Sequence, residues 1–368
     1  MKTPFELTDE WGPYKVIHIN RPVTGLKAIV VVDNIACGPA IGGTRMAPDV
    51  SLEECARLAR AMTFKNAAAG LPHGGAKSVI FADPGMPAQD KQMLMRDFAA
   101  AIKQLEDYIP GPDMGTNEQS MAWVFDEIHR AVGLPREIGG IPLDEIGATG
   151  LGVAVAAEVA QEFCDLKIND ARIAIQGFGA VGQHAARFLI SKGATLVAVA
   201  DSKGTIYDKN GIDVEDLVKV KRQGRPVSTF GSGEVLDCDD VIAVDCDVWV
   251  PAARPDVLTR DNIKDLKARL VVQGANIPAT AEAEKMMYER GIMNIPDFIA
   301  NAGGVICASV EYHGGNESAA VDVIAGKIER NTRAVLSNSA VQNILPRQAA
   351  ENLAKQRVAT AMELRRWS

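Results

Sequence analysis

The amino-acid sequence predicts an α/β protein built from two domains. A chain of 368 residues is too long for one ordinary core, because domains average roughly 150 residues. Hydrophobic residues make up 47% of the chain and charged residues 23%, a balance that allows buried cores and excludes wholesale disorder. Over residues 172–200 a strand, a glycine turn, a helix and a second strand follow one another, which is the alternation of a parallel βαβ unit.

The first third of the chain contains both strands and helices. Residues 27–33 are a continuous β-branched run, which is typical of a buried strand. A capping-box pair, Ser51 and Glu54, begins a helix whose apolar residues recur at helical spacing. Residues 71–81 combine a glycine turn with a short apolar strand, and residues 88–105 form an amphipathic helix.

The segment of residues 134–150 is rich in glycine and proline and lacks periodicity, so it marks the domain boundary. Beyond it, the sequence predicts helices at 153–163, 181–191 and 281–290, the last capped by Thr280, and strands at 172–176, 195–200, 248–251 and 270–273. From residue 321 onward only helices are expected, with a break at Pro346. We therefore divide the chain into residues 1–140, 141–330 and 331–368.

The composition excludes several classes of function. The net charge is −8, from 39 basic and 47 acidic residues, and no basic stripe is present, so nucleic acid is not an expected partner. The six cysteines show no CxxC spacing and the five histidines no HxxxH or HExxH spacing, which argues against a metal site. No apolar run approaches the roughly 18 residues of a membrane span, and the opening residues lack a signal-peptide core. We expect a cytoplasmic protein with no membrane partner.

A phosphate-binding turn stands between the predicted strand at 172–176 and the helix at 181–191. Its GxGxxG spacing is made by Gly177, Phe178, Gly179, Ala180, Val181 and Gly182. In this context the first glycine permits a tight turn, the second lets the backbone approach a pyrophosphate, and the third lets helix and strand pack closely. The sequence therefore predicts a dinucleotide-binding domain of the Rossmann type. The alternative is a turn whose glycines serve packing alone.

The choice of nucleotide depends on Asp201, about 20 residues after the glycine turn. A carboxylate at the end of the next strand accepts hydrogen bonds from the ribose hydroxyls and repels the 2′-phosphate of NADP, so NAD is favoured. Ser202 and Lys203 follow directly and would suit a phosphate, which keeps NADP as the alternative.

Two lysines and one aspartate are the candidate catalytic groups. Lys65 and Lys77 are joined by a glycine turn that can bring them together. A lysine near a second cation in a partly dry cleft loses its proton more easily and can act as a general base, while the other holds a substrate carboxylate. Asp113 lies in a rigid proline and glycine loop and supplies a fixed carboxylate. Solvated surface lysines and a helix-cap aspartate are the alternatives.

The chain resembles the glutamate, leucine, phenylalanine and valine dehydrogenase superfamily in motifs that follow one another nearly from end to end: AIGGTR, TFKNAAAGLPHGGAK, GPDMGTNEQSMAW, ATGLGV, GFGAVG, VVQGANIPAT and NAGGV. The resemblance implies a homo-oligomer that converts an L-amino acid to a 2-oxo acid and ammonia, reversibly, with NAD(P). It also implies that residues 1–140 form a substrate domain, completed by the C-terminal helices, across a cleft from the Rossmann domain.

The resemblance also implies roles for single residues. Lys65 matches the lysine that binds the substrate α-carboxylate, Lys77 the catalytic lysine that activates water, and Asp113 the aspartate that exchanges a proton with the amino group. Three further residues match positions around the nicotinamide and the floor of the cleft: Thr149, Asn276 and Asn301.

The identity of the amino acid depends on two positions. Family members that act on glutamate resemble one another in a lysine before the Gly-Gly pair of the first motif, and that position is Ile41 here, next to the backbone of Gly42. A second pocket position, often serine in those members, is Ala308. Without a cation, a buried γ-carboxylate costs several kcal/mol or more, so we expect an apolar or small neutral substrate. Two motifs, GPDMGTNEQSMAW and GANIPAT, look more like the glutamate branch.

Three alternatives are open at this stage. A glutamate dehydrogenase would need another cation for the γ-carboxylate, such as Arg45 or Lys103. A catalytically silent nucleotide-binding regulator would be expected to have lost one of the three catalytic candidates, which are all present. A 2-hydroxyacid dehydrogenase would need a histidine paired with a carboxylate, for which only His73 is a candidate.

Overall fold

The computed structural model describes residues 4–365 and divides the chain into two compact units. The first unit comprises the chain up to Pro142, residues 305–320 and residues from Glu351 onward, and the second comprises residues 143–304 and 321–350. The sequence predicts the last boundary between residues 330 and 331. Helix α10 (Glu317–Gln342) continues through residues 330 and 331 without a break. The chain instead passes from one unit to the other after residues 304, 320 and 350, and each of these points lies within a helix.

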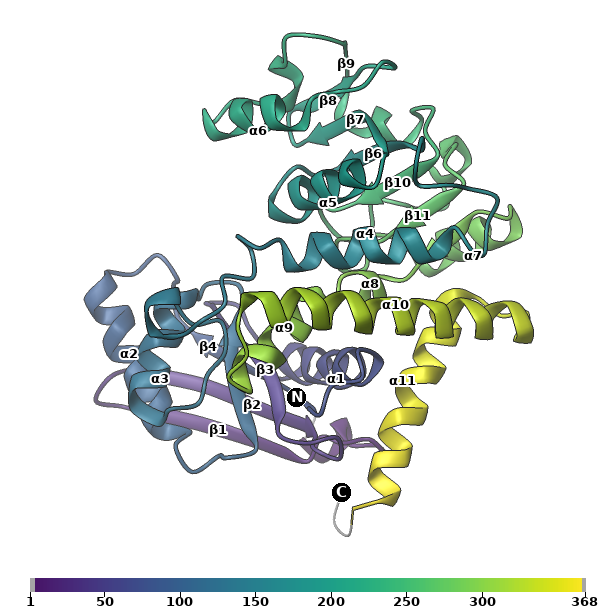
Figure 1. Ribbon diagram of the computed structural model, residues 1–368. Helices are drawn as coiled ribbons and strands as arrows, with labels where there is room; N and C mark the ends of the chain where they lie inside the picture. Colours follow the sequence, from purple (N-terminus) through teal and green to yellow (C-terminus); the bar gives the residue numbers. More distant parts are fainter. Residues whose placement is uncertain (1–3, 366–368) are drawn as a thin grey trace. The chain divides into compact units, whose positions relative to one another are not determined.

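The first unit is built on a five-stranded mixed sheet (Figure 1). Its strands are β1 (Lys15–Arg21), β2 (Leu26–Asn34), β3 (Ala40–Ala47), β4 (Gly75–Phe81) and β5 (Tyr108–Pro112), in the spatial order β1-β2-β4-β3-β5. The pairs β1/β2 and β2/β4 are antiparallel, whereas β3 runs parallel to both β4 and β5. The carboxyl ends of β3 and β5 therefore meet at one edge of the sheet.

Helices cover both faces of this sheet, which explains the continuous apolar run of β2. Ala28, Val30 and Val32 join the core that faces α2 (Ala88–Ala101) and α3 (Glu118–Ile128). Ile29 and Val31 join the core that faces α1 (Leu52–Ala68). Alternate residues of a strand point to opposite faces, so a strand covered on both sides needs apolar residues throughout. The predicted strand and helices of this region are confirmed.

Two C-terminal segments complete the first unit. They are residues 305–320, which include most of α9 (Gly303–Tyr312), and the residues from Glu351 onward, which include most of α11 (Pro346–Glu363). The guanidinium of Arg357 on α11 donates to the carbonyl oxygens of Ala67 and Ala68 at the end of α1, at 3.0 and 2.6 Å. A cation at a helix C-terminus satisfies carbonyls that have no partner within the helix, so this contact ties the end of the chain to the first unit.

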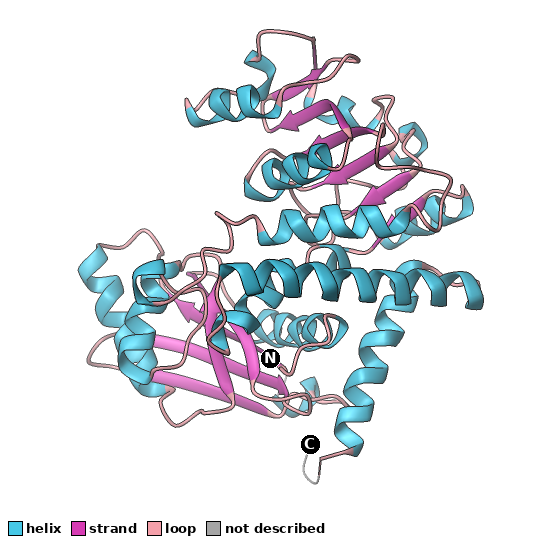
Figure 2. Ribbon diagram, in the orientation of Figure 1, coloured by secondary structure: helices cyan, strands magenta, loops and turns pink. Residues whose placement is uncertain are grey.

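The second unit contains a seven-stranded sheet, drawn in magenta in Figure 2. Its strands are β6 (Arg172–Gln176), β7 (Thr195–Asp201), β8 (Gly204–Tyr207), β9 (Glu234–Leu236), β10 (Val248–Pro251), β11 (Leu270–Val272) and β12 (Met293–Ile295), in the order β12-β11-β10-β6-β7-β8-β9. The strands from β12 to β7 are parallel and the last two are antiparallel. The chain leaves β6 toward β7 and later returns to β10 on its other side, so the strand order reverses at β6, where such sheets bind ligands.

The remaining helices of the second unit are α4 (Ala148–Ala160), α5 (Ala180–Ser191), α6 (Val214–Arg222), α7 (Ala281–Glu289), α8 (Asp297–Ala300) and most of α10, with short 3-10 helices along the chain at Pro4–Leu7, Arg136–Ile138, Val227–Thr229, Cys238–Ile242 and Ile263–Asp265. The helix predicted from residue 153 begins at Ala148 instead. The N-cap residue is Gly147, whose φ of 67° is in the left-handed region that glycine adopts without strain. Because glycine has no side chain, no side-chain hydrogen bond caps this helix. No helix of the described residues is long and apolar enough to cross a membrane.

Candidate active site

One face of the first sheet carries the candidate catalytic groups across three adjacent strands. Strand β3 lies between β4 and β5, and its register places Gly43 opposite Gly111 of β5. On the other side, the pairings of Ile41 with Gly75 and of Thr44 with Ser78 place Gly43 beside Lys77 of β4. Because side chains two residues apart share a face, Lys77, Gly43, Gly111 and Asp113 all lie toward the same side. The middle of this face therefore has no side chains of its own.

The side chain of Lys77 extends over Gly43, which together with Gly111 is called here the bare strip, to reach Asp113. The ammonium of Lys77 donates to the carboxylate of Asp113, forming an ion pair that spans strand β3. The side chain of Lys77 is only 7% exposed and that of Asp113 is 22% exposed, so the pair is largely withdrawn from bulk water. A Cβ at Gly43 would lie 2.8 Å from Cβ of Asp113 and 3.0 Å from Nζ of Lys77. Gly43 is thus required for the contact between the two catalytic candidates.

A second cation, Arg45, holds the other side of the aspartate. Its Nε donates to the same Oδ2 of Asp113 at 3.2 Å, and its Nη1 donates to Glu54 on α1 at 2.5 Å. Burial favours the neutral form of Asp113, but the charges of Lys77 and Arg45 outweigh it and lower the pKa of Asp113 below its ordinary value. Asp113 is therefore an ionised carboxylate placed between two cations.

The loop that carries Asp113 is fixed by hydrogen bonds to strand β3. The hydroxyl of Thr116 accepts from the backbone N–H of Asp113 at 3.0 Å and donates to the carbonyl oxygen of Thr44 at 2.7 Å. The N–H of Met46 donates to the carbonyl of Met114 at 2.9 Å. These bonds fix the loop to strand β3 through Thr116 and the backbone, and they set the position of the carboxylate, whose Oδ2 accepts from both cations.

Lys65 lies in the last turn of α1 and is partly exposed. The residues around it hold the turn that leads to Lys77. The buried amide of Asn66 donates to the carbonyl of Gly74 at 2.7 Å, and a Cβ at Gly75 would lie 2.0 Å from the backbone nitrogen of Thr63. Helix α1 therefore packs directly on the start of β4, and both predicted lysines come from elements in close contact.

Both predicted side-chain pocket residues belong to one small apolar cluster. Ile41 on β3 and Ala308 on α9 are buried together with Ile109 on β5 and Val132, which follows α3. Ile41 pairs with Ile109 in the sheet register, two residues before the Gly43 and Gly111 pair. Ile109 and Val132 are not predicted from the sequence. The alternation of Ile109, Gly111 and Asp113 is typical of a strand and could have indicated Ile109. The structure thus places Ile41 and Ala308 in the same cluster.

The glycines of the phosphate-binding turn have three distinct environments in the second unit. Gly177 has a φ of +96°, and a Cβ there would lie 2.7 Å from the backbone of Ala253. A Cβ at Gly182 would lie 2.0 Å from the carbonyl oxygen of Gly177, so this glycine permits close packing. Gly179 is exposed and faces open space, with no atom within 4 Å of its missing Cβ. A turn of this shape, at the N-terminus of the 12-residue helix α5, fits a dinucleotide pyrophosphate.

Asp201 ends strand β7 beside this turn. Its Oδ1 accepts from the backbone N–H of Lys203 at 2.9 Å, while its Oδ2 accepts from Nζ of Lys221 at 2.7 Å and from the N–H of Val227 at 3.0 Å. Burial opposes its ionisation, but these donors lower the pKa of Asp201 below its ordinary value. Ser202 is exposed next to it. The ionic partner Lys221, on helix α6, was not expected from the sequence.

The three residues matched to the nicotinamide region lie in the same unit. Asn301 donates from Nδ2 to Oδ1 of Asn276 at 2.9 Å, which joins the loop after β11 to the end of α8. Thr149 lies in the first turn of α4, and a Cβ at Gly303 would lie 3.1 Å from its backbone nitrogen. Asn276 and Asn301 are therefore in direct contact, and Thr149 lies against Gly303, two residues after Asn301. No group of three or more metal-ligating side chains occurs within residues 4–365.

His73 lies in the turn before Lys77 and is 1% exposed. Its Nδ1 bonds to the carbonyl oxygen of Pro39 at 3.0 Å, and its ring packs against Tyr312 and His313 with centroid distances of 5.6 and 5.2 Å. Burial lowers the pKa of His73 from 6.5 to about 4. Its direct partners are a carbonyl and two rings, so the histidine and carboxylate pair of a 2-hydroxyacid dehydrogenase is not formed at this residue.

A sheet with a lysine and aspartate centre, next in the chain to a doubly wound sheet with a phosphate-binding turn, defines a two-domain dehydrogenase that uses a nicotinamide dinucleotide. The chain belongs to the glutamate/leucine/phenylalanine/valine dehydrogenase family. The family model matches residues 139–366, and a second model, described as the dimerisation domain of the same family, matches residues 13–130. The resemblance seen in the sequence is confirmed, and the chain is an NAD(P)-dependent amino-acid dehydrogenase.

Relatives with solved structures or curated names differ in substrate. A glutamate dehydrogenase of Aeropyrum pernix is 37% identical over 91% of this chain and 85% of its own length. The hetero-hexameric glutamate dehydrogenase of Thermus thermophilus, in a leucine-bound form, has a TM-score of 0.84 and 30% identity, covering 96% of this chain and 90% of that one. The L-tryptophan dehydrogenase of Nostoc punctiforme has a TM-score of 0.78 and 26% identity, covering 98% and 99%.

Relatives also differ in cofactor. A relative from Pyrobaculum calidifontis is named an NADP(+)-dependent glutamate dehydrogenase, and one from Staphylococcus aureus is named NAD-specific. They are 36% and 35% identical to this chain and cover 96% and 97% of it. Family membership therefore establishes a nicotinamide dinucleotide and leaves the choice between the two forms to the residues of this chain.

Replacing Gly43 with alanine tests whether the bare strip is required. The new methyl group would lie 2.8 Å from Cβ of Asp113, so it displaces Asp113 from Lys77. A displacement of about 1 Å at a catalytic centre costs about a hundredfold in rate, so we expect kcat to fall by about that factor. NADH binding, measured by fluorescence, should not change. The control is Gly231→Ala, where no atom lies within 4 Å of the added Cβ; equal kcat values for the two variants would refute the requirement.

The buried neutral His73 predicts a pH dependence of stability. Between its ordinary pKa of 6.5 and about 4 the unfolded chain binds a proton that the folded chain does not. The free energy of unfolding therefore falls as pH is lowered, by up to about 1.4 kcal/mol per pH unit from this one group. Urea midpoints measured from pH 7 to pH 5 should fall less steeply for His73→Asn than for the wild type. His18→Asn, at an exposed position, should keep the wild-type slope. Parallel profiles for all three proteins would contradict the assignment.

Proposed function

We propose that the chain catalyses the NAD-dependent oxidative deamination of an L-amino acid with an apolar or small neutral side chain. The observation that carries the proposal is the apolar cluster of Ile41, Ile109, Val132 and Ala308, which lies on the sheet face of the catalytic pair. Lys77 and Asp113 suit the amino group and α-carbon that every amino acid shares. The apolar cluster therefore determines which substrate side chain is accepted.

The spacing along the strands fits one amino acid. The Ile41 and Ile109 pair is separated by two residues from the Gly43 and Gly111 pair, where Lys77 crosses the sheet. Two residues of a strand span about 7 Å, which is close to the length of a leucine, methionine or aromatic side chain. A substrate whose α-carbon lies over the glycines would therefore place its side chain on Ile41.

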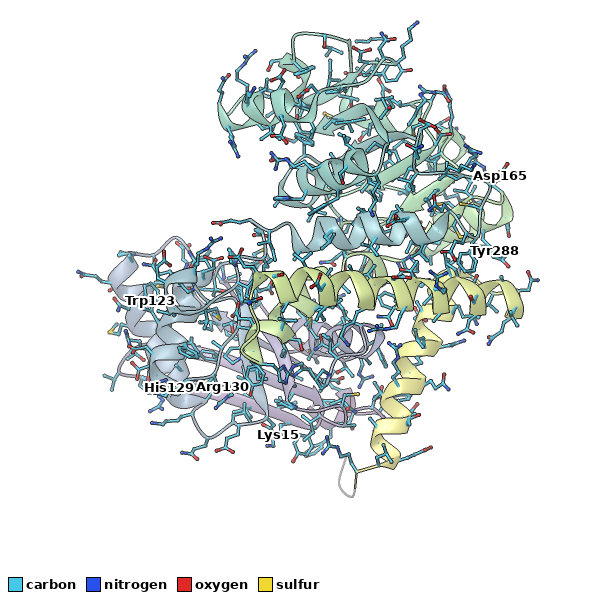
Figure 3. All side chains as sticks on the ribbon, viewed as in Figure 1. Lys15, Trp123, His129, Arg130, Asp165 and Tyr288 are labelled. Carbon is cyan, nitrogen blue, oxygen red and sulfur yellow. The ribbon has the colours of Figure 1, made fainter. Side chains whose placement is uncertain are left out.

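In the part of the chain that the structure describes, the cluster that a glutamate side chain would reach consists of Ile41, Ile109, Val132 and Ala308, none of which is a cation. An ionised carboxylate moved into an apolar site without a partner costs several kcal/mol. Arg45 already bonds to Asp113 and Glu54, and Lys103 is exposed on the turn after α2. Arg130, labelled beyond the end of α3 in Figure 3, donates from its guanidinium to the carbonyls of Ile102, Leu105 and Tyr108. Because Arg45 and Arg130 are already hydrogen-bonded and Lys103 is exposed, these residues support a substrate with a neutral side chain.

The roles of the catalytic residues follow from their chemistry. We assign Lys65 to the substrate α-carboxylate. When bound, the nicotinamide ring accepts the hydride from the substrate α-carbon, which leaves an iminium. When the substrate ammonium takes the place of Lys77 at Asp113, Lys77 gives its proton to solvent, and the neutral amine then removes a proton from the water that attacks the iminium carbon. Asp113 takes a proton from the substrate ammonium before hydride loss and returns it to the nitrogen, which departs as ammonia while the remaining hydroxyl loses its proton to form the 2-oxo acid. The two cations beside Asp113 keep it ionised until the amino group arrives.

NAD is the nucleotide that the residues after β7 suit better. Oδ1 of Asp201 has one neighbour, the N–H of Lys203, and retains acceptor capacity for a ribose hydroxyl. Lys221 offsets part of the negative charge that would repel a 2′-phosphate. We therefore propose a preference for NAD with measurable use of NADP.

The two units have separate tasks in this proposal. The unit with Lys77 and Asp113 binds the amino acid, and the unit with the phosphate-binding turn binds the nucleotide. Oligomerisation is supported by the dimerisation-domain model over residues 13–130 and by the hetero-hexameric relative, and the homo-oligomer is the form that the family resemblance implies.

Glutamate dehydrogenase is the second candidate function. The observation in its favour is the name of relatives that are 37% and 40% identical to this chain. Glutamate turnover would require a cation other than the three arginine and lysine residues discussed above.

A panel of L-amino acids assayed with NAD⁺ and with NADP⁺ tests the proposed function. We expect kcat/KM to be highest for an apolar amino acid among Leu, Ile, Val, Met, Phe, Trp and Ala, and higher with NAD⁺ than with NADP⁺, measured by the absorbance of the reduced nicotinamide. Faster turnover of L-glutamate than of every member of the panel would establish the second candidate instead.

The variant Ile41→Lys tests the pocket itself. A lysine at this position adds the missing cation to the apolar cluster, so we expect the ratio of glutamate to apolar kcat/KM to rise by at least about tenfold. Ile138→Lys makes the same change at a position that is 46% exposed and should leave the ratio unchanged. An unchanged ratio in Ile41→Lys would show that Ile41 does not face the substrate side chain.

A further inference from the structure

The loop after strand β11 contains a backbone conformation that its residue disfavours. Ile277 has a φ of +48°. Among the described non-glycine residues with positive φ it is the only β-branched one, the others being His129, Asp170, Asp256 and Asn343. Its side chain is 58% exposed, so burial does not compensate for the strain. Such a conformation costs on the order of 1–3 kcal/mol and persists only where the surroundings hold it.

Two hydrogen bonds hold the Ile277 backbone. Its N–H donates to Oδ2 of Asp297 at 2.9 Å, and its carbonyl accepts from the N–H of Asp256 at 2.9 Å. Asp297 is 5% exposed and is the first residue of α8. Its other oxygen, Oδ1, accepts from Nη2 of Arg347 at 2.9 Å. The carboxylate of Asp297 is therefore fixed by a buried cation before it holds the loop.

The neighbouring residue presents a polar group to a ligand. Asn276 is exposed, and its Oδ1 accepts from Nδ2 of Asn301 at 2.9 Å. This bond leaves the NH2 group of Asn276 as the donor available to a ligand. Asn301 and Asp297 are four residues apart at the two ends of α8, so one short helix fixes both the side chain of Asn276 and the peptide that follows it.

The loop lies where the nicotinamide half of a dinucleotide belongs. The N–H groups of Gly274 and Ala275 donate to the carbonyl of Pro251 at the end of β10, at 3.0 and 2.8 Å. A Cβ at Gly274 would lie 3.2 Å from Val181 in the phosphate-binding turn. The adenosine half lies over β6 and β7 in such folds, so the other half extends over β10 and β11.

We infer that Asp297 is a positioning residue for the cofactor: by holding the strained Ile277 peptide, it aims the amide of Asn276 at an acceptor on the nicotinamide ribose or carboxamide. The inference rests on the nucleotide placement of the proposed function and not on the identity of the amino acid. Arg347 acts indirectly, because it orients the carboxylate of Asp297 and does not itself bond to the loop. Without Asp297 the Ile277 peptide relaxes toward negative φ, and Asn276 turns away.

Three variants test this inference in the full-length chain. Asp297→Ala removes the acceptor of the Ile277 N–H, while Asp297→Asn keeps one. Glu284→Gln is the structural control: Glu284 is 3% exposed, pairs with Arg347 at 2.6 and 2.8 Å and accepts from Nε2 of Gln273 at 2.7 Å, but it bonds to neither Ile277 nor Asp297. NADH dissociation constants are measured by fluorescence without any amino acid. The KM for NAD⁺, the KM for the amino acid and the melting temperature follow with whichever amino acid the wild type turns over fastest.

Asp297→Ala should raise both the NADH dissociation constant and the KM for NAD⁺ by about fivefold or more, as loss of one hydrogen bond does, with the amino-acid KM within about twofold of the wild type. Asp297→Asn should restore most of the affinity. Glu284→Gln should lower the melting temperature with nucleotide constants within about twofold of the wild type. Wild-type nucleotide constants in Asp297→Ala, or an equal rise in Glu284→Gln, would overturn the inference. If Asp297→Ala does not fold, Arg347→Lys replaces it: a rise of about threefold in the KM for NAD⁺ supports the inference and an unchanged KM overturns it.

A wrong substrate assignment leaves these constants untouched, because NADH binding is measured without substrate. Failure of the inference with a normal panel result would leave the proposed function standing.

Discussion

The ion pair of Lys77 and Asp113 is the interaction on which the rest of the candidate site depends. Lys77 lies on β4 and Asp113 directly follows β5, and these two strands are separated by β3, so the two backbones are about 10 Å apart, two strand spacings. A lysine side chain bridges that distance only if nothing stands on the intervening strand. Gly43 provides the gap, and Gly111 continues it beside β5. Gly43, the second glycine of AIGGTR, is therefore a condition for the catalytic contact.

Along this face of the sheet, the charged residues, the glycines and the apolar residues follow one another in that order. Arg45 and Asp113 lie at the carboxyl ends of β3 and β5, the glycines lie in the middle, and Ile41 and Ile109 lie two residues before them. A charged end and an apolar end on one rigid surface suit an amino acid bound lengthwise. The opposite face is closed by a network in which the Tyr108 hydroxyl bonds to Ser78 at 2.8 Å. The strands that carry the site are thus fixed from behind. In the second unit, glycines again create the space, and the carboxylates of Asp201 and Asp297 are each fixed by a cation, Lys221 and Arg347.

Much of the nucleotide unit could be predicted because its signals are local. The strand at 172–176 and the Thr280 cap were predicted at the observed residues, since a short apolar run and a capping threonine determine their own structure. Strands β3 and β5 were not predicted, because their glycines and prolines resemble turns. The contact between Lys77 and Asp113 follows from sheet order, which no local pattern encodes. The same holds for Val132 and Lys221, whose partners lie far away in the chain. The sequence suggested that Lys65 would be the close neighbour of Lys77, whereas the observed ionic partner is the carboxylate of Asp113.

The measurement that tests the central claim most directly compares turnover and nucleotide binding in Lys77→Ala. If Lys77 is the catalytic base, oxidative deamination falls by at least about a thousandfold with every amino acid, while the NADH dissociation constant and the melting temperature stay close to those of the wild type. A purified Lys77→Ala enzyme that binds NADH and still deaminates an amino acid within about tenfold of the wild-type rate would contradict the account.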